Sequence, residues 1–333
     1  METIINVDDV SFSYSTQTEQ ALSHISLSVN KRDFIGIIGP SGAGKSTLAA
    51  CLSGAVPHHY TGTFFGSVMV DGHDTCEVSL TDVSQIVGSV LQDIDTQMVA
   101  SVVEDEMLFG LENFGVPHDQ IEQRVSETLE TVGISDLRDR EIATLSGGQK
   151  QKVAIAAILA MRPRVLVLDE PTAALDPASS TLVFETLREA NRALGITIVV
   201  VEQKVALLSE YCNRVLVLNH GEIALQGEPH EVFAHTDELR AIGVDCPRVT
   251  RIFNSLEADG LVSGTPCLDV DEAERMISGI VDPAHAAIEA QAPAGSPHAP
   301  SLRPHAKDAN PYSPSTMLSL PIPMAAPPYT TLA

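Results

Sequence analysis

The sequence lacks tryptophan altogether and has few aromatic residues, which make up 4% of its 333 positions. Basic residues are also scarce, because 20 Lys and Arg stand against 44 Asp and Glu and leave a formal net charge of −24. A surface this acidic repels phosphate backbones, so we expect no nucleic-acid partner. Basic proteins, or partners without charge, suit it better.

Cysteine pairs and long apolar runs are missing as well. The five cysteines are scattered and form no Cys-x-x-Cys pair, which argues against a disulfide framework or a zinc site and favours a reducing cytosol. The first ten residues lack the basic region and apolar stretch of a signal peptide. Apolar runs such as 153–161 are too short to span a membrane, so if the protein works at a membrane, something else holds it there.

What the sequence does contain is an alternation of strand-like and helix-like segments. Apolar runs at 34–39, 164–170 and 196–202 read as buried strands, and periodic segments between them read as helices. This alternation predicts an α/β layer. In such layers ligands bind at the carboxyl ends of the strands, so we look for a site there.

Changes in composition predict where the domains end. The α/β pattern occupies residues 1–227, and residues 228–282 still show helical patterning, as a small extension would. From residue 283 the chain becomes rich in Pro, Ala and Ser, and it carries no charge from Pro311 onward. We therefore expect a disordered tail over 283–333.

The segment after the first of these strands matches the phosphate-loop pattern G-x-x-x-x-G-K-[ST]. Its residues are Gly39, Pro40, Ser41, Gly42, Ala43, Gly44, Lys45, Ser46 and Thr47. Glycines let the backbone turn its N–H groups toward phosphate oxygens, and a helix that begins near Lys45 adds its positive dipole end. We expect Lys45 to reach the β- and γ-phosphates of ATP and Ser46 to bind Mg²⁺. The alternative, a glycine-rich turn with an exposed lysine, is disfavoured by the strand and helix that flank the loop.

Two acids end the apolar strand at 164–170. A buried strand does not normally end in two carboxylates unless a cation or water binds them, because burying an unpaired charge costs free energy. Asp169 is placed to hold Mg²⁺ through water, and Glu170 is placed to orient or deprotonate the attacking water. Alone, the pair could be an ordinary solvated strand end. Together with a phosphate loop, it indicates a site of ATP hydrolysis.

A Ser-Gly-Gly segment upstream of these acids completes a family pattern. The segment consists of Leu145, Ser146, Gly147, Gly148 and Gln149. With the two motifs above, it resembles the ATPase subunit of ATP-binding cassette (ABC) transporters. The resemblance implies an α/β P-loop NTPase core of RecA type, a helical signature subdomain at about 93–160, an N-terminal antiparallel β subdomain and a small C-terminal extension. In this family the segment caps the γ-phosphate bound by the other subunit, which implies a head-to-tail homo- or heterodimer with two shared ATP sites.

Other positions match the family in order. Tyr14 resembles the aromatic residue that stacks on adenine, although a half-buried strand tyrosine is the alternative. Gln92 resembles the glutamine that contacts Mg²⁺ and water and senses the membrane partner, and Asp176 resembles the aspartate that links the two sites. One position departs, because Gln203 stands where the family usually has a histidine that contacts the γ-phosphate. An amide donates a hydrogen bond but carries no positive charge, so we expect a working but slower site.

Two further segments, 92–117 and 243–251, resemble the energy-coupling factor group of these ATPases. Such systems power the uptake of vitamins and trace metal ions, and they pair two ATPases with a transmembrane scaffold protein and a separate substrate-binding membrane protein. The resemblance therefore implies a peripheral protein at the cytoplasmic face of the cell membrane. A soluble non-transport ABC protein and a regulatory ATP-binding subunit with little hydrolysis are the alternatives.

Acidic residues crowd the region beside Gln92. They are Asp93, Asp95, Glu104, Asp105 and Glu106. In the group that the chain resembles, the cytoplasmic helices of the scaffold present arginines, and an acidic groove would receive them. The alternative is an ordinary solvated charged face.

Overall fold

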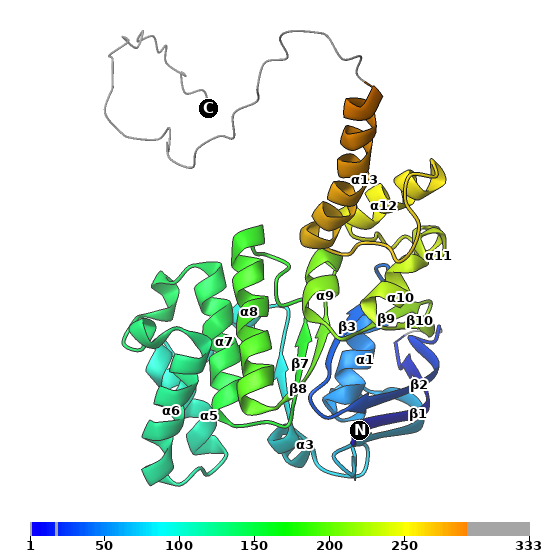
Figure 1. The fold of residues 1–333 in the computed structure, drawn as a ribbon. Helices are drawn as coiled ribbons and strands as arrows, with labels where there is room; N and C mark the ends of the chain where they lie inside the picture. Colours follow the sequence, from blue (N-terminus) through cyan, green and yellow to red (C-terminus); the bar gives the residue numbers. More distant parts are fainter. Residues whose placement is uncertain (1, 17–18, 292–333) are drawn as a thin grey trace, which may run out of the picture. The chain divides into compact units, whose positions relative to one another are not determined.

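A six-stranded, mostly parallel sheet forms the centre of the fold in the computed structural model, which describes residues 2–16 and 19–291 (Figure 1). Its strand order is β10-β9-β3-β8-β7-β6, and all neighbours run parallel except β10 and β9. The strands are β3 (Phe34–Ile38), β6 (Val87–Val90), β7 (Val165–Asp169), β8 (Thr197–Val201), β9 (Arg214–Asn219) and β10 (Glu222–Gly227). Every residue of β3 and β8 is buried, as expected for strands covered on both faces.

Successive side chains of these strands enter two different cores, because they point to opposite faces of the sheet. Phe34 faces a core that also contains buried residues of α8 (Pro177–Leu194) and α9 (Val205–Tyr211). Ile35 faces a second core, which it shares with α1 (Lys45–Leu52) and the antiparallel sheet. The parallel sheet therefore lies between two apolar layers. Polar groups are placed at the ends of its strands.

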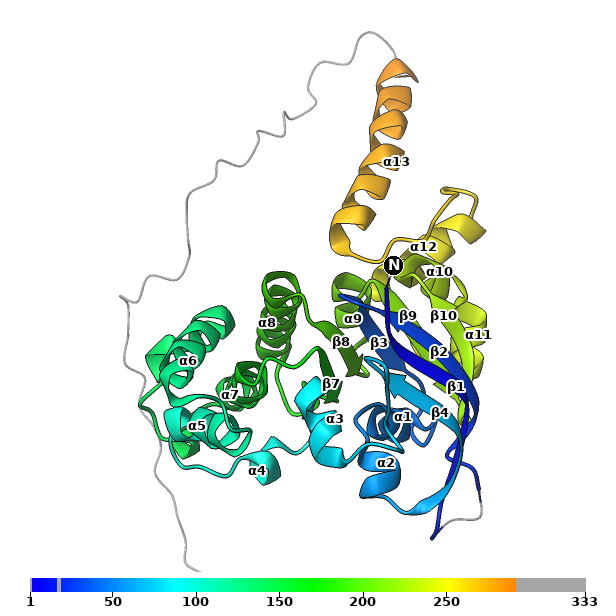
Figure 2. The same cartoon turned by 90° about the horizontal axis from the view of Figure 1, so that it is seen from below.

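The antiparallel sheet has the strand order β2-β1-β4-β5 and begins at the N-terminal end of the described chain. Its strands are β1 (Thr3–Tyr14), β2 (Leu22–Asn30), β4 (Gly62–Val70) and β5 (His73–Asp74). The short helices α2 (Ala55–His58) and α3 (Leu80–Ile86) lie in the segments before β4 and after β5. Antiparallel pairing of β1 with both β2 and β4 confirms the predicted N-terminal antiparallel β subdomain, and Figure 2 shows α1 beside this sheet.

A group of helices between β6 and β7 forms the predicted helical subdomain (Figures 1 and 2). It contains α4 (Ile94–Gln97), α5 (Val103–Asn113), α6 (His118–Val132), α7 (Gly147–Ala160) and two 3-10 turns, Ser135–Leu137 and Ile142–Thr144. One face of α6 is apolar at helical spacing and buried, through Ile121, Val125, Leu129 and Val132. The predicted core, helical subdomain and β subdomain are thus all present.

Arg138 joins three segments of this helical subdomain. Its guanidinium donates from Nε to Glu104 Oε1 on α5 at 3.1 Å, and from two nitrogens to both carboxylate oxygens of Glu122 on α6 at 2.8 and 2.7 Å. This bidentate contact lowers the pKa of Glu122 to about 2. The fork of Arg138 therefore holds α5 and α6 against the 3-10 turn that precedes it.

Within the described part of the chain, four helices follow β10. They are α10 (Pro229–Ala234), α11 (Thr236–Ala241), α12 (Arg248–Ala258) and α13 (Val270–Gln291). Helix α13 differs from our prediction, because it includes 283–291, where we expected the disordered tail to begin; this stretch is rich in alanine, the best helix former. The rest of the predicted tail, 292–333, lies outside the described residues. None of the described helices combines the length and the apolar character that crossing a membrane requires.

We expect Arg138→Met to lower the Tm of the protein by a few degrees at neutral pH, because two carboxylates lose their partner. The folded-state pKa of Glu122 is depressed from 4.5 to about 2, so its stabilising contribution is complete above pH 4.5 and is lost as pH falls toward 2. The Tm difference between wild type and variant should therefore shrink over that window in a differential scanning fluorimetry series. Arg162→Met, which removes an exposed pair with Glu127, is the matched control. A Tm difference that stays constant throughout would contradict the assignment.

Candidate active site

The phosphate loop turns between β3 and α1, at the carboxyl edge of the parallel sheet. Two of its glycines are sterically required. A Cβ at Gly39 would lie 2.2 Å from the carbonyl oxygen of Leu218, and one at Gly44 would lie 2.4 Å from that of Ala21. Both glycines have positive φ, 154° and 97°, in the region that favours glycine.

The ammonium group of Lys45 lies inside this loop. Its Nζ donates to the carbonyl oxygens of Gly39 at 2.8 Å and Pro40 at 2.9 Å, and the residue is only 7% exposed. Burial lowers the pKa of Lys45, while the nearby Glu170 and Asp169 act in the opposite direction. The loop therefore holds a cation at its centre, at the beginning of a helix where an anion binds favourably.

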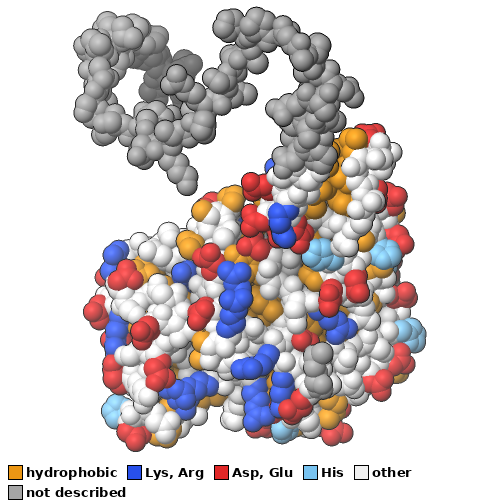
Figure 3. All heavy atoms as spheres, in the orientation of Figure 1, with side chains coloured by type: hydrophobic (Ala, Val, Ile, Leu, Met, Phe, Trp, Pro, Cys, Tyr) orange, Lys and Arg blue, Asp and Glu red, His pale blue; other side chains and the backbone are white. Residues whose placement is uncertain are grey.

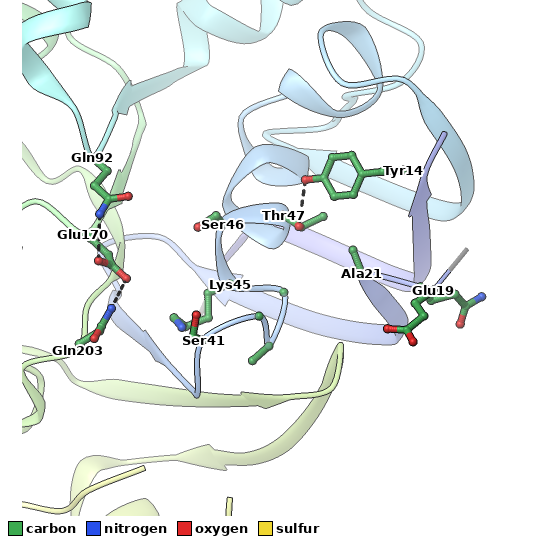
Figure 4. Close-up of a pocket in the computed structure, with 14 residues that line it drawn as sticks. Tyr14, Glu19, Ala21, Ser41, Lys45, Ser46, Thr47, Gln92, Glu170 and Gln203 are labelled. Atoms are coloured by element: carbon green, nitrogen blue, oxygen red, sulfur yellow. Dashed lines mark hydrogen bonds between the residues drawn. The ribbon is translucent and has the colours of Figure 1, made fainter. Parts of the chain in front are cut away.

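A cavity of about 530 Å³ opens over the loop, a size typical of sites for small molecules. Figure 4 shows that Lys45 and Ser41 lie near its middle, Glu170 and Gln203 at one end, and Tyr14 at the other. Of the predicted loop, residues 41–47 line its walls, together with Gln92, Glu19, Gln20 and Ala21. The last three were not among the predicted residues. They come from the segment before β2, which has no motif and reaches the cavity only through the pairing of β1 with β2.

Asp169 and Glu170 follow one another at the end of β7 but meet different surroundings. The Oδ1 atom of Asp169 is buried and has no hydrogen-bond partner within the described residues. Burial raises the pKa of Asp169, and the nearby Ser46 and Lys45 oppose that rise. A buried carboxylate oxygen without a partner, next to a serine hydroxyl, is a donor set that fits Mg²⁺.

Glu170 is held in a strained backbone conformation. Its φ is 49°, in the left-handed region that residues with a Cβ seldom adopt. The backbone N–H of Glu170 donates to the carbonyl oxygen of Val201 on β8 at 2.9 Å, which fixes the turn against the neighbouring strand. The turn directs the carboxylate into the cavity beside the phosphate loop (Figure 4).

Two amides fix the carboxylate of Glu170. Gln203 Nε2 donates to Oε1 at 2.6 Å, and Gln92 Nε2 donates to Oε2 at 3.3 Å. The two glutamines come from the ends of β8 and β6, so three strand ends converge on one carboxylate. The structure thus brings together Glu170, Gln203 and Gln92, although their catalytic roles remain predictions.

Tyr14 ends β1 and forms one wall of the cavity. Its hydroxyl lies 3.0 Å from Thr47 Oγ1, and its ring makes edge contacts with Phe12 and Tyr60 at centroid distances of 4.8 and 6.1 Å. The hydroxyl contact anchors the ring beside the start of α1. Stacking of adenine on this ring remains a prediction.

The signature segment is not brought to this cavity. Ser146 caps α7 by accepting from Gln149 N at 3.3 Å, and Gln149 Oε1 accepts from Ser146 N at 2.9 Å, which completes a capping box. With Gly148, these residues line a separate cavity of about 230 Å³ that also touches Ser179. Asp176 caps the neighbouring helix α8 by accepting from Ser179 N at 3.0 Å and Ser179 Oγ at 2.6 Å, and these bonds lower its pKa.

Three of the five acids of the predicted groove beside Gln92 have partners within the chain, and the groove itself stays a prediction. Asp95 pairs with Lys150 at 2.7 Å, Glu104 is bound by Arg138, and buried Glu106 accepts from the N–H groups of residues 99 and 100 at 2.9 and 2.7 Å. Glu106 is buried and Glu104 is half-buried, whereas Asp93, Asp95 and Asp105 are exposed. Acidic side chains are otherwise dispersed over the face shown in Figure 3.

The sequence is similar to known ABC proteins over most of its length. The family model for ABC transporters matches residues 22–173. A putative ABC transporter ATP-binding protein of Pyrococcus horikoshii is 43% identical over 259 residues, covering 78% of this chain and 91% of that protein. The energy-coupling factor transporter ATP-binding protein EcfA1 of Clostridium perfringens is 38% identical over 276 residues, covering 81% of this chain and 96% of that protein.

The chain belongs to the ABC transporter ATP-binding proteins of the energy-coupling factor type. Solved structures agree with this assignment. CbiO1 from Clostridium perfringens, part of the ABC transporter complex cbiONQ, is 34% identical with a TM-score of 0.66, covering 77% of this chain and all of that one. A dimeric ATP-binding cassette in a post-hydrolysis state, with ADP and phosphate bound, is 26% identical with a TM-score of 0.58, covering 68% and 98%. The predicted P-loop ATPase fold is confirmed, and as a member of this family the chain is a nucleotide-binding ATPase.

We expect Gln203→His to raise the rate of single-turnover ATP hydrolysis by about threefold to tenfold, because a protonated imidazole adds positive charge near the γ-phosphate. Rapid-quench measurement of phosphate release from a single turnover tests this. Gln123→His on the exposed face of α6 is the matched control. An unchanged rate in Gln203→His would show that the missing charge does not limit this site.

Proposed function

We propose that this chain binds and hydrolyses ATP as the ATPase subunit of an energy-coupling factor importer for a vitamin or a trace metal ion. The observation that carries the proposal is the carboxylate of Glu170, fixed by Gln203 and Gln92 beside a phosphate loop that holds Lys45. An acid held by two amide donors at a strained turn fits a base that must be aimed at one water molecule. Similarity to an energy-coupling factor transporter ATP-binding protein over most of the chain supports this proposal.

The proposed reaction follows from the positions of these groups. Lys45 and the loop N–H groups hold the β- and γ-phosphates, and Tyr14 provides a surface for the adenine ring. Glu170 accepts a proton from water as the water oxygen bonds to the γ-phosphorus, and the bond from that phosphorus to the β–γ bridging oxygen breaks. ADP leaves with the bridging oxygen, and the γ-phosphoryl group leaves as inorganic phosphate. Gln203 keeps the carboxylate aimed during this step.

Mg²⁺ is the metal that fits the site. Ser46, Asp169 and the amide oxygen of Gln92 would hold it, Asp169 through water, and the buried Oδ1 of Asp169 would gain the partner that it lacks among the described residues. When bound, the ion neutralises charge on the phosphate oxygens. Ser46 and Lys45 are adjacent, so one turn of α1 supplies both a metal ligand and a phosphate ligand.

A second ATPase subunit completes the site in this proposal. Ser146, Gly147 and Gly148 start a helix and present a hydroxyl and N–H groups, yet they lie away from the Lys45 cavity of their own chain. Binding to the γ-phosphate of a second, head-to-tail subunit, identical or not, gives this anion site a ligand. The related cassette solved as a dimer with ADP and phosphate supports such an arrangement.

A transmembrane scaffold, which also engages a separate substrate-binding membrane protein, is the other proposed partner. It would hold this chain peripherally at the cytoplasmic face of the membrane. A groove of about 180 Å³ on the helical subdomain is mostly apolar, and its lining includes Met98, Val99, Phe109, Ala157, Ile158 and Met161. The exposed Asp105 lies one turn before Phe109 on the same helix, α5. An apolar groove with an acidic edge suits an amphipathic helix that presents arginines.

The docking proposal predicts that Asp105→Lys weakens co-purification with the scaffold. The charge reversal places a lysine against the scaffold's arginines, while the fold is unaffected because Asp105 is exposed. Pull-down from detergent-solubilised membranes, with Asp119→Lys on the exposed start of α6 as control, measures the effect. Equal recovery of the scaffold with both variants would argue against docking at this groove.

The hydrolysis proposal predicts that Glu170→Gln reduces phosphate release by about 100-fold or more, the contribution expected of a positioned base. ATP affinity should change little, because the phosphate loop is untouched. Phosphate release and ATP binding are measured on the same preparation, with Glu185→Gln on the exposed face of α8 as control. A variant that still hydrolyses ATP at the wild-type rate would exclude Glu170 as the base.

A further inference from the structure

Lys204 directly follows Gln203, but its ammonium group binds a segment other than the phosphate loop. Its Nζ donates to the carbonyl oxygens of Thr172 at 2.7 Å and Leu175 at 3.0 Å, and to Ser180 Oγ at 2.7 Å. An ammonium group has three N–H donors, so these three acceptors use all of them. The cation therefore binds the segment 172–180, which connects the end of β7 to the start of α8.

Glu202, on the other side of Gln203, binds the same segment. This carboxylate is 1% exposed; its Oε2 accepts from Thr172 Oγ1 at 2.5 Å, and its Oε1 accepts from the backbone N–H groups of Gln203 at 2.8 Å and Lys204 at 3.2 Å. Thr172, itself fully buried, is thus held through its hydroxyl and its carbonyl oxygen. Gln203 lies between two residues that are both tied to the segment after Glu170.

The same segment packs against the signature segment. A Cβ placed on Gly148 would lie 3.1 Å from Cβ of Ser179, and one placed on Gly147 would lie 3.2 Å from Cδ2 of Leu175. The start of α7 therefore lies close against residues 175 and 179, with little space for a side chain at either glycine. We expect a displacement of the signature segment to shift Leu175 and Ser179, and Lys204 is bound to Leu175 and to the next residue after Ser179, Ser180.

We propose that Lys204 is a positioning residue that couples the signature segment to the carboxylate of Glu170. Its three bonds fix residues 172–180 to the turn that carries Gln203, and Gln203 in turn holds Glu170 Oε1. In the proposed dimer, the signature segment of this chain contacts the nucleotide of the second subunit, so Lys204 links that contact to the base of its own site. The inference rests on the proposed function, because it requires Glu170 to act in hydrolysis.

The test replaces the ammonium group and keeps the length of the side chain. We expect Lys204→Met in the full-length chain to lower kcat for ATP hydrolysis by about tenfold, as a displaced base would, with the Kd for ATP changed by less than about twofold. Ser180→Ala removes one of the three acceptors and should lower kcat by about threefold. Lys31→Met, on the turn between β2 and β3, is the control that should hydrolyse ATP at the wild-type rate.

A double-mutant cycle separates positioning from a general effect on folding. If Lys204 acts through Gln203, the double variant Gln203→Ala/Lys204→Met should be no slower than Gln203→Ala alone. Fully additive losses, or a Lys204→Met variant with the wild-type kcat, would overturn the inference. If Lys204→Met fails to fold, Ser180→Ala decides, and a wild-type kcat there overturns the inference as well. Absence of hydrolysis in the wild-type chain would instead refute the proposed function.

Discussion

The adjacency of β3, β8 and β7 in the parallel sheet is the constraint on which the site depends. Parallel strands end at the same edge, so the phosphate loop after β3, Gln203 after β8 and Glu170 after β7 lie next to one another. Backbone bonds extend this register beyond the strands, because Glu170 N donates to Val201 O and Glu202 N donates to Ile37 O. Apolar layers pack on both faces of the sheet and fix its strands. The polar residues that follow the carboxyl ends of these strands are positioned by the sheet.

The same architecture separates the signature segment from the phosphate loop of its own chain. The signature segment belongs to the helical subdomain, whose core is built from α5, α6 and α7 and whose segments are joined by Arg138. Its Ser146 caps a helix of its own and faces a separate small cavity. In the proposed head-to-tail dimer, the phosphate loop of one subunit and the signature segment of the other would bind the same nucleotide.

The sequence predicts the parts of the site that local pattern determines. The phosphate loop, the acids at the end of a buried strand and the capped Ser-Gly-Gly helix each depend on residues close together in the chain, and the structure has the strands and helices expected around them. It does not predict partners brought together by folding. Glu104 was assigned to an external groove because nothing near it in sequence reveals Arg138, which lies 34 residues away. Lys204 was missed for the same reason, because its acceptors lie 24 to 32 residues earlier.

All of the proposed chemistry requires Lys45 and its loop to bind the phosphates of a magnesium nucleotide. Titration calorimetry of the purified full-length chain with ATP, in the presence and absence of Mg²⁺, tests it most directly. The account predicts saturable binding that requires Mg²⁺ for full affinity and that Lys45→Met abolishes. No measurable heat of binding with Mg²⁺ and ATP, or equal binding by wild type and Lys45→Met, would contradict it.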